Sequence, residues 1–159
     1  MKEITLKLNY KEYDSIEEMS QEDQQLVKAA LESQAGSYSP YSNFQVGAAL
    51  RLANGVIVKG ANQENAAYPS GLCAERTAMF WASANYPDVP FDTLAIAGSD
   101  HGELCESPAS PCGACRQVMA EYQKKYGRPL KTIWVGSKRI RKFESVDDIL
   151  PFIFDSLKV

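Results

Sequence analysis

Three cysteines and one glutamate are spaced in a way that strongly restricts how this chain can fold. Cys112 and Cys115 lie three residues apart directly after Pro111, and Cys73 and Glu75 stand two residues apart earlier in the chain. Residues three apart at a helix start share a face, so the Cys112 and Cys115 sulfurs can reach one ion. If Cys73 stands at the mouth of a second helix, Glu75 falls in its first turn. The spacing therefore predicts that two helix N-termini meet at a three-cysteine zinc site, with a water as the fourth ligand.

Two arginines follow the predicted site residues directly. Arg76 follows Glu75, and Arg116 follows Cys115. Free backbone N–H groups at a helix start favour thiolate over thiol, and three thiolates with Zn²⁺ carry a net charge of about −1. Because thiolates donate electron density to the metal, hydrogen bonds from Arg76 and Arg116 would offset part of this charge. The alternative is that both arginines lie on helix surfaces without a role at the metal.

Glu75 is predicted to be the catalytic proton shuttle. A reactive water needs a base that later becomes the acid for the leaving group, and a carboxylate that is not a metal ligand can serve as both. The alternative is a first-turn glutamate that only complements the helix dipole. His101 lies in a polar loop, so a histidine ligand or a Cys/His nucleophile pair is not expected, and Cys105 is interpreted as a spare thiol.

Other uses of the cysteines remain open at this stage. Four cysteines could form two disulfides, although a chain of this size without an export signal favours a metal or catalytic use. A thioredoxin-like pair at Cys112 and Cys115 would leave Cys73 and Glu75 unexplained. A purely structural zinc site would need Glu75 or Cys105 as its fourth ligand. Three thiolate ligands favour zinc over iron.

Composition narrows the class of protein. The chain has 159 residues, of which 45% are hydrophobic, and this suits one domain with a proper core. The formal net charge of −3 offers no basic surface for a polyanion, so we expect a small, weakly charged substrate and no nucleic-acid partner. The sequence has no secretory signal and no run of about eighteen apolar residues. We therefore expect a soluble cytoplasmic protein that does not bind membranes.

Hydrophobic periodicity predicts alternating helices and strands. The predicted strands are an alternating segment from Ile4 to Tyr10, the runs 44–52 and 56–61 joined by a hairpin at Asn54-Gly55, and the runs that begin at Asp92 and Lys131. The predicted helices are 20–36, 73–84, 112–126 and a short one within 145–154. This alternation is typical of a layered α/β domain.

Longer segments carry a family resemblance. The segments YSPYSNFQVGAAL, NQENAAYPSGLCAERTA and SPCGACRQV resemble the small, single-domain cytidine deaminases of pyrimidine salvage. Cys73-Ala74-Glu75 with the later Pro-Cys-x-x-Cys run also resembles the signature of zinc-dependent nucleobase deaminases. The resemblance runs from about residue 20 to the C-terminus, and the predicted domains are an N-terminal strand-like extension over 1–15 and a cytidine deaminase domain over 16–159.

The resemblance implies a fold, a reaction and an assembly. The implied fold has three layers, α/β/α, around a mixed sheet of about five strands. The implied reaction is zinc-dependent hydrolysis of cytidine and 2'-deoxycytidine to the uridines and ammonia, with one zinc ion per chain. The implied assembly is a homotetramer.

It also implies roles for individual residues. Asn62 and Glu64 match residues that bind the ribose 3'-hydroxyl, although both could be ordinary turn residues. Phe44 matches an aromatic of the nucleoside pocket, with core packing as the alternative. Backbone groups around Ala74 would read the pyrimidine edge. Phe154 matches, loosely, an aromatic that completes the active site of a neighbouring subunit, and core burial is its alternative.

Two features of the sequence depart from the family pattern. In addition, two other classes of substrate remain as alternatives to cytidine. The first fifteen or so residues extend beyond the compact members, where an added edge strand could extend a subunit contact. Gly71-Leu72 precedes Cys73 where many members have a polar residue. Another aminated base or a nucleoside-like antibiotic is an alternative substrate, which Asn62 and Glu64 disfavour. A polynucleotide substrate is disfavoured by the acidic charge.

Overall fold

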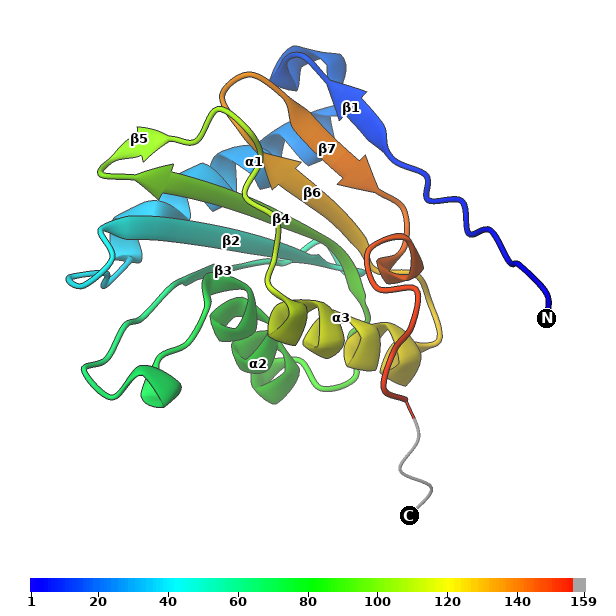
Figure 1. Ribbon diagram of the computed structural model, residues 1–159. Helices are drawn as coiled ribbons and strands as arrows, with labels where there is room; N and C mark the ends of the chain where they lie inside the picture. Colours follow the sequence, from blue (N-terminus) through cyan, green and yellow to red (C-terminus); the bar gives the residue numbers. More distant parts are fainter. Residues whose placement is uncertain (156–159) are drawn as a thin grey trace.

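The structure, a computed structural model that describes residues 1–155, is built on a mixed β-sheet (Figure 1). The strand order is β1-β7-β6-β4-β2-β3, and β5 pairs with β4. The strands are β1 (Lys11–Tyr13), β2 (Phe44–Leu52), β3 (Ile57–Ala61), β4 (Phe91–Asp100), β5 (Glu103–Leu104), β6 (Lys131–Val135) and β7 (Ile140–Phe143). Within the described residues the sheet therefore has seven strands, where about five were predicted.

Helices cover both faces of the sheet and make three layers. Helix α1 (Gln21–Ser33) lies on one face, and α2 (Ala74–Asn85) and α3 (Gly113–Tyr126) lie together on the other (Figure 1). The part of the chain that the structure describes also contains four short 3₁₀ helices: η1 (Ile16–Glu18), η2 (Gln34–Gly36), η3 (Tyr68–Ser70) and η4 (Val146–Asp148). The α/β/α prediction is confirmed. No helix in the described part of the chain has the length and apolar character needed to cross a membrane.

The period-two pattern of the strands divides the core into two parts. Along β2, Leu50 and Leu52 face α2 and α3, whereas Ala49 faces α1. Helix α1 packs Leu26 and Val27 on that second face. Both faces of the central strands are buried, which explains why their sequences read as nearly continuous apolar runs.

A close approach between β3 and α2 fixes the start of the helix that carries Glu75. A Cβ atom added at Gly60 would lie 2.6 Å from the Ala74 carbonyl oxygen and 2.6 Å from the Ala78 nitrogen. Only glycine fits at this contact. The first turn of α2 therefore rests directly on the edge strand.

Two predicted elements differ from the structure. Residues 1–10 have no regular structure, and Ile4 is 80% exposed, so the strand predicted from Ile4 to Tyr10 was wrong. The strand instead follows as β1, which pairs with β7. The helix predicted within 145–154 is reduced to the single turn of η4. The last four residues of the predicted domain 16–159 lie outside the described residues.

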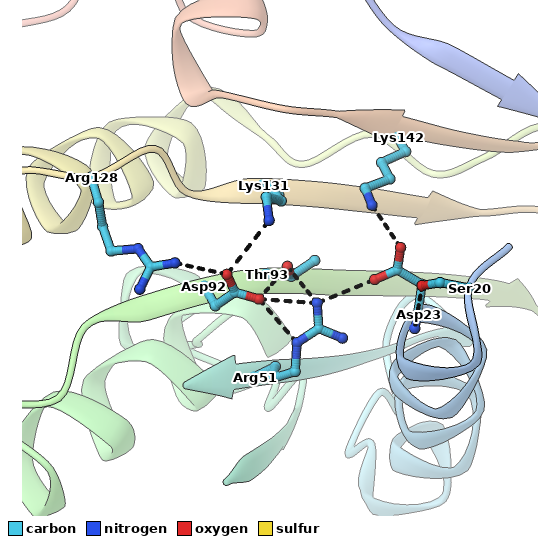
Figure 2. Close-up of polar contacts among 8 residues, drawn as sticks. All are labelled: Ser20, Asp23, Arg51, Asp92, Thr93, Arg128, Lys131 and Lys142. Atoms are coloured by element: carbon cyan, nitrogen blue, oxygen red, sulfur yellow. Dashed lines mark hydrogen bonds and ion pairs between the residues drawn. The ribbon is translucent and has the colours of Figure 1, made fainter. Parts of the chain in front are cut away.

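A cluster of charged side chains lies at the edge of the sheet where β2 ends. Figure 2 shows the Arg51 guanidinium between two carboxylates, with Nη2 at 3.2 Å from Asp23 Oδ1 and 2.9 Å from Asp92 Oδ2. Lys142 Nζ lies 2.6 Å from Asp23, and Arg128 Nη2 lies 3.0 Å from Asp92. Burial opposes ionisation of both carboxyl groups. Lys142 and Arg51 outweigh it for Asp23, and the Thr93 hydroxyl, Arg51 and Lys131 outweigh it for Asp92, so the pKa of each lies below its usual value. Both are therefore ionised near neutral pH.

Candidate metal centre and active site

Three thiols meet where α2 and α3 begin. The sulfur atoms of Cys73, Cys112 and Cys115 all lie within 4.8 Å of one another, and the Cys112 and Cys115 sulfurs are 3.6 Å apart. Cys73 is the N-cap of α2 and Cys112 is the N-cap of α3. All three are free thiols, so the structure does not contain the disulfides considered above. The cysteine cluster and its placement at two helix starts are as predicted.

The pKa values of Cys73 and Cys115 are shifted in opposite directions. Hydrogen bonds from Cys115 and from Arg76 lower the pKa of the Cys73 thiol to about 5, although burial works against them. The same contact with Cys73, together with burial, raises the pKa of Cys115, which acts as the donor. Three sulfur donors within reach of one point are a zinc ligand set that leaves a fourth tetrahedral position open. The residues present fit one zinc ion per chain.

Glu75 lies buried beside this cluster. It is in the first turn of α2 and only 5% exposed. Burial raises the pKa of its carboxyl, and the charge of Cys73 adds to the effect. A carboxyl with a raised pKa can both take and return a proton near neutral pH, as an acid–base group must.

A cavity of about 200 Å³ opens onto Glu75, Cys73 and Cys112. It is lined by Phe44, Val46, Asn62, Cys73, Ala74, Glu75, Ile96, Ala109, Ser110 and Cys112. Phe44, Asn62 and Ala74 were predicted from the resemblance, whereas Val46, Ile96, Ala109 and Ser110 were not. Of these four, Ser110 directly precedes the Pro-Cys motif, and its position was the only indication in the sequence.

Gly98 leaves space for the Phe44 ring in the cavity wall. A Cβ atom at Gly98 of β4 would lie 2.8 Å from the Ala109 side chain and 3.0 Å from Phe44 Cζ. The Phe44 ring and Ala109 therefore both pack against bare backbone. Phe44 is half-buried and forms part of the cavity wall.

Asn62 and Glu64 bind the chain on either side of Phe44. Asn62 Oδ1 accepts from Val46 N at 2.8 Å, and Asn62 Nδ2 donates to the Phe44 carbonyl oxygen at 2.9 Å. The Glu64 carboxylate accepts from Tyr41 N at 2.9 Å, from Ser42 N at 3.2 Å and from the Ser42 hydroxyl. Asn62 lines the cavity, whereas Glu64 lines an adjoining depression that shares Asn62 and Cys73 with it.

The two arginines have different contacts. Arg76 Nη2 donates to the Cys73 sulfur at 3.4 Å, in agreement with the expected role. Arg116 donates from Nε to the Pro111 carbonyl oxygen at 2.9 Å and from Nη1 to the Ile149 carbonyl oxygen at 3.0 Å. These contacts correct the expectation for Arg116: its guanidinium binds one carbonyl just before the helix start and one in the C-terminal segment, whereas Arg76 is the arginine that donates to a thiol.

Replacing Arg76 by glutamine should make zinc binding more sensitive to acid. Arg76 helps to keep Cys73 a thiolate down to a pH of about 5. Without its charge the Cys73 pKa rises, protons compete for the sulfur at higher pH, and zinc affinity falls about 10-fold at neutral pH. Zinc released to a colorimetric chelator, measured across pH 5 to 8, checks this. Arg139→Gln, which removes an exposed arginine near Glu12, is the matched control; equal release from both variants would contradict the role of Arg76.

The remaining predicted residues lie away from the cavity. Phe154 is 67% exposed, so its ring is not buried in the core, and among residues 1–155 it is not part of the cavity wall. His101 lies in an exposed turn with a ring nitrogen 2.7 Å from the Asp100 carboxylate, as expected of a loop residue. Cys105 lies outside the thiol cluster, so it remains the spare thiol.

Comparison with known proteins agrees with this site. Residues 20–126 match the cytidine and deoxycytidylate deaminase zinc-binding region. The cytidine deaminase of Halalkalibacterium halodurans is 50% identical over 98 residues, which are 62% of this chain and 70% of that protein. For the cytidine deaminase of Sporosarcina psychrophila the identity is 43% over 99 residues, covering 62% of this chain and 68% of that protein.

Solved structures agree as well. The crystal structure of cytidine deaminase from Burkholderia pseudomallei has 40% sequence identity and a TM-score of 0.71, covering 86% of this chain and all of the other. The family match takes in the three cysteines of the thiol cluster and Glu75, which lines one cavity together with Cys73 and Cys112. The chain therefore belongs to the cytidine and deoxycytidylate deaminase family.

Proposed function

We propose that the protein hydrolyses cytidine and 2'-deoxycytidine to uridine and 2'-deoxyuridine with release of ammonia, as an enzyme of pyrimidine salvage. The observation that carries this proposal is the buried Glu75 carboxyl, which shares a small cavity with Cys73 and Cys112 of the thiol cluster. The cytidine deaminases to which the chain is similar support the choice of substrate.

Cys73, Cys112 and Cys115 would hold the zinc ion, which when bound lowers the pKa of a water and so supplies a nucleophile at neutral pH. Glu75 takes the proton of the attacking water as the water adds to C4 of the base. The same carboxyl then protonates N3, takes the second proton from the new C4 hydroxyl and passes it to the amino group, which leaves as ammonia when the C4–N bond breaks; one side chain thus acts as base and as acid in turn. Its raised pKa supports this exchange.

Cavity residues can orient the nucleoside. Phe44 offers an aromatic face to the base, and backbone groups at Ala74 offer hydrogen bonds to the pyrimidine edge. Three of the roughly four acceptor sites of the Glu64 carboxylate bind the Tyr41–Ser42 loop, so one remains for a sugar hydroxyl. Asn62 has a second amide N–H beyond the one donated to Phe44. Asn62 and Glu64 would therefore bind the ribose while they also hold the backbone around Phe44.

The assembly that completes this site would be a homotetramer in the cytoplasm, where nucleosides are salvaged. Phe154 has a largely exposed ring on a segment that packs along α3. In an oligomer this ring would cover the cavity of a neighbouring subunit, and an exposed aromatic side chain is well suited to such a contact.

Purified protein should contain one zinc ion per chain and should deaminate both nucleosides. The decrease in cytidine absorbance in the ultraviolet, measured beside metal analysis of protein prepared without chelator, checks this. Full zinc occupancy without turnover of cytidine or 2'-deoxycytidine would contradict the proposed substrates. It would favour another aminated base or a structural zinc site.

A further inference from the structure

One face of α3 holds the C-terminal segment 145–155. Gln117 and Lys124 are seven residues apart and therefore lie on the same face, as do Arg116 and Gln123. All four side chains contact this segment. Gln123 accepts from Val146 N at 3.0 Å, Arg116 donates to the Ile149 carbonyl oxygen, and Lys124 donates to that of Asp155. The segment is thus fastened along α3 although η4 is its only helical turn within the described residues.

Gln117 binds the backbone of Phe154. Its Nε2 donates to the Phe154 carbonyl oxygen at 2.8 Å, and its Oε1 accepts from Phe154 N at 3.3 Å. The Gln117 side-chain amide thus binds both the N–H and the C=O group of Phe154, as a residue of an adjacent β-strand would. It fixes the backbone of Phe154 and leaves mainly the side-chain torsions free. The ring itself stays 67% exposed.

The same helix also carries the zinc ligands. Cys112 caps α3 and Cys115 lies in its first turn, directly before Arg116 and Gln117. Arg116 contacts both the Pro111 carbonyl before Cys112 and the Ile149 carbonyl in the C-terminal segment. The backbone of Phe154 is therefore held at a fixed place relative to the thiol cluster of its own chain.

We infer that Gln117 is a positioning residue, which directs the Phe154 ring towards the nucleoside cavity of a second copy of this chain. This inference rests on the proposed function. Gln117 does not line the cavity of its own chain among the described residues, so it would act only through Phe154. Removal of the Gln117 side chain should weaken the binding of substrate and of transition state equally. KM should therefore rise while kcat stays unchanged.

A double-mutant cycle tests this inference. Gln117→Ala and Phe154→Ala should each raise the KM for cytidine about five-fold, because an aromatic contact is lost or misplaced in both. The double variant should be no worse than Phe154→Ala, since Gln117 has nothing left to position. Zinc content and kcat should stay at the level of the unaltered protein. Glu121→Ala, which changes an exposed residue of the same helix, is the matched control and should leave KM unchanged.

The outcomes separate this inference from the proposed function. A KM for Gln117→Ala equal to that of the unaltered protein, with a raised KM for Phe154→Ala, would overturn the inference and leave the proposed function intact. Additive effects of the two substitutions would also overturn it, because Gln117 would then act independently of Phe154. An unaltered protein that binds zinc but does not deaminate cytidine would refute the proposed function, and the inference would fail with it.

Discussion

Glu75→Gln protein should keep its zinc and lose its deaminase activity. The amide has nearly the shape of the carboxyl, so the first turn of α2 and the nearby thiols should stay in place. It cannot take a proton from water or return one to the base. General acid–base catalysis contributes up to about 10⁴-fold, and Glu75 would serve in more than one proton transfer, so we expect kcat to fall at least about 10⁴-fold. Single-turnover assays with metal analysis of the same sample measure both quantities.

The control for this substitution is another glutamate of the same layer. Glu121→Gln changes an exposed side chain of α3 and should leave both activity and zinc unchanged. Loss of zinc together with activity in Glu75→Gln would mean that the carboxyl is a ligand and that the site is closed. The protein would then contain a structural zinc site.

Arg51→Met protein should be less stable by about 3 kcal/mol, because the substitution removes one partner from a buried ionic cluster. The side chains of Arg51, Asp23 and Asp92 are 13%, 6% and 14% exposed. Methionine fills much of the space but cannot donate hydrogen bonds. The Asp23 carboxylate would then have only Lys142 as a charged partner. The Asp92 carboxylate would lose its contacts with Arg51 Nε and Nη2 (Figure 2). Urea denaturation followed by circular dichroism measures the loss, and the slope of the transition should stay the same.

An exposed ion pair provides the comparison. Lys59 Nζ lies 2.7 Å from Glu32, but the two side chains are 50% and 67% exposed. Lys59→Met should therefore change the free energy of unfolding by less than about 1 kcal/mol. If both variants lost the same stability, burial of the Arg51 cluster would not be the cause of its effect.

Local sequence patterns predicted the elements that have strong patterns of their own. Helix α1 begins at Ser20, whose hydroxyl accepts from Asp23 N as the capping pattern indicated. The β2–β3 hairpin also forms around Asn54-Gly55. The alternation from Ile4 to Tyr10 was misleading, because a strand needs a neighbour, and within the N-terminal segment β7 pairs only with residues 11–13. Since β7 is four residues long and rich in charge, its own pattern was too weak to predict it.

The same limit applies to the site. The spacing of Cys73, Cys112 and Cys115 was enough to predict a common metal centre, because helix starts have a fixed geometry. Contacts between distant segments were not predictable in this way. Arg116 follows Cys115 in the sequence, but neighbouring residues of a helix point in directions about 100° apart, and its guanidinium contacts the carbonyl of Ile149 instead.

The cysteine N-caps link the metal to the outer layer of the fold. Serine or aspartate at an N-cap usually accepts a hydrogen bond from the first turn, whereas Cys73 and Cys112 make no such bond within the described residues. Both helix starts therefore lack the usual side-chain acceptor for their first-turn amide groups. A zinc ion bound by both cysteines would cross-link the N-terminus of α2 to the N-terminus of α3. Loss of the metal would then release both helix starts together, so the stability of the layer that α2 and α3 form would depend on zinc.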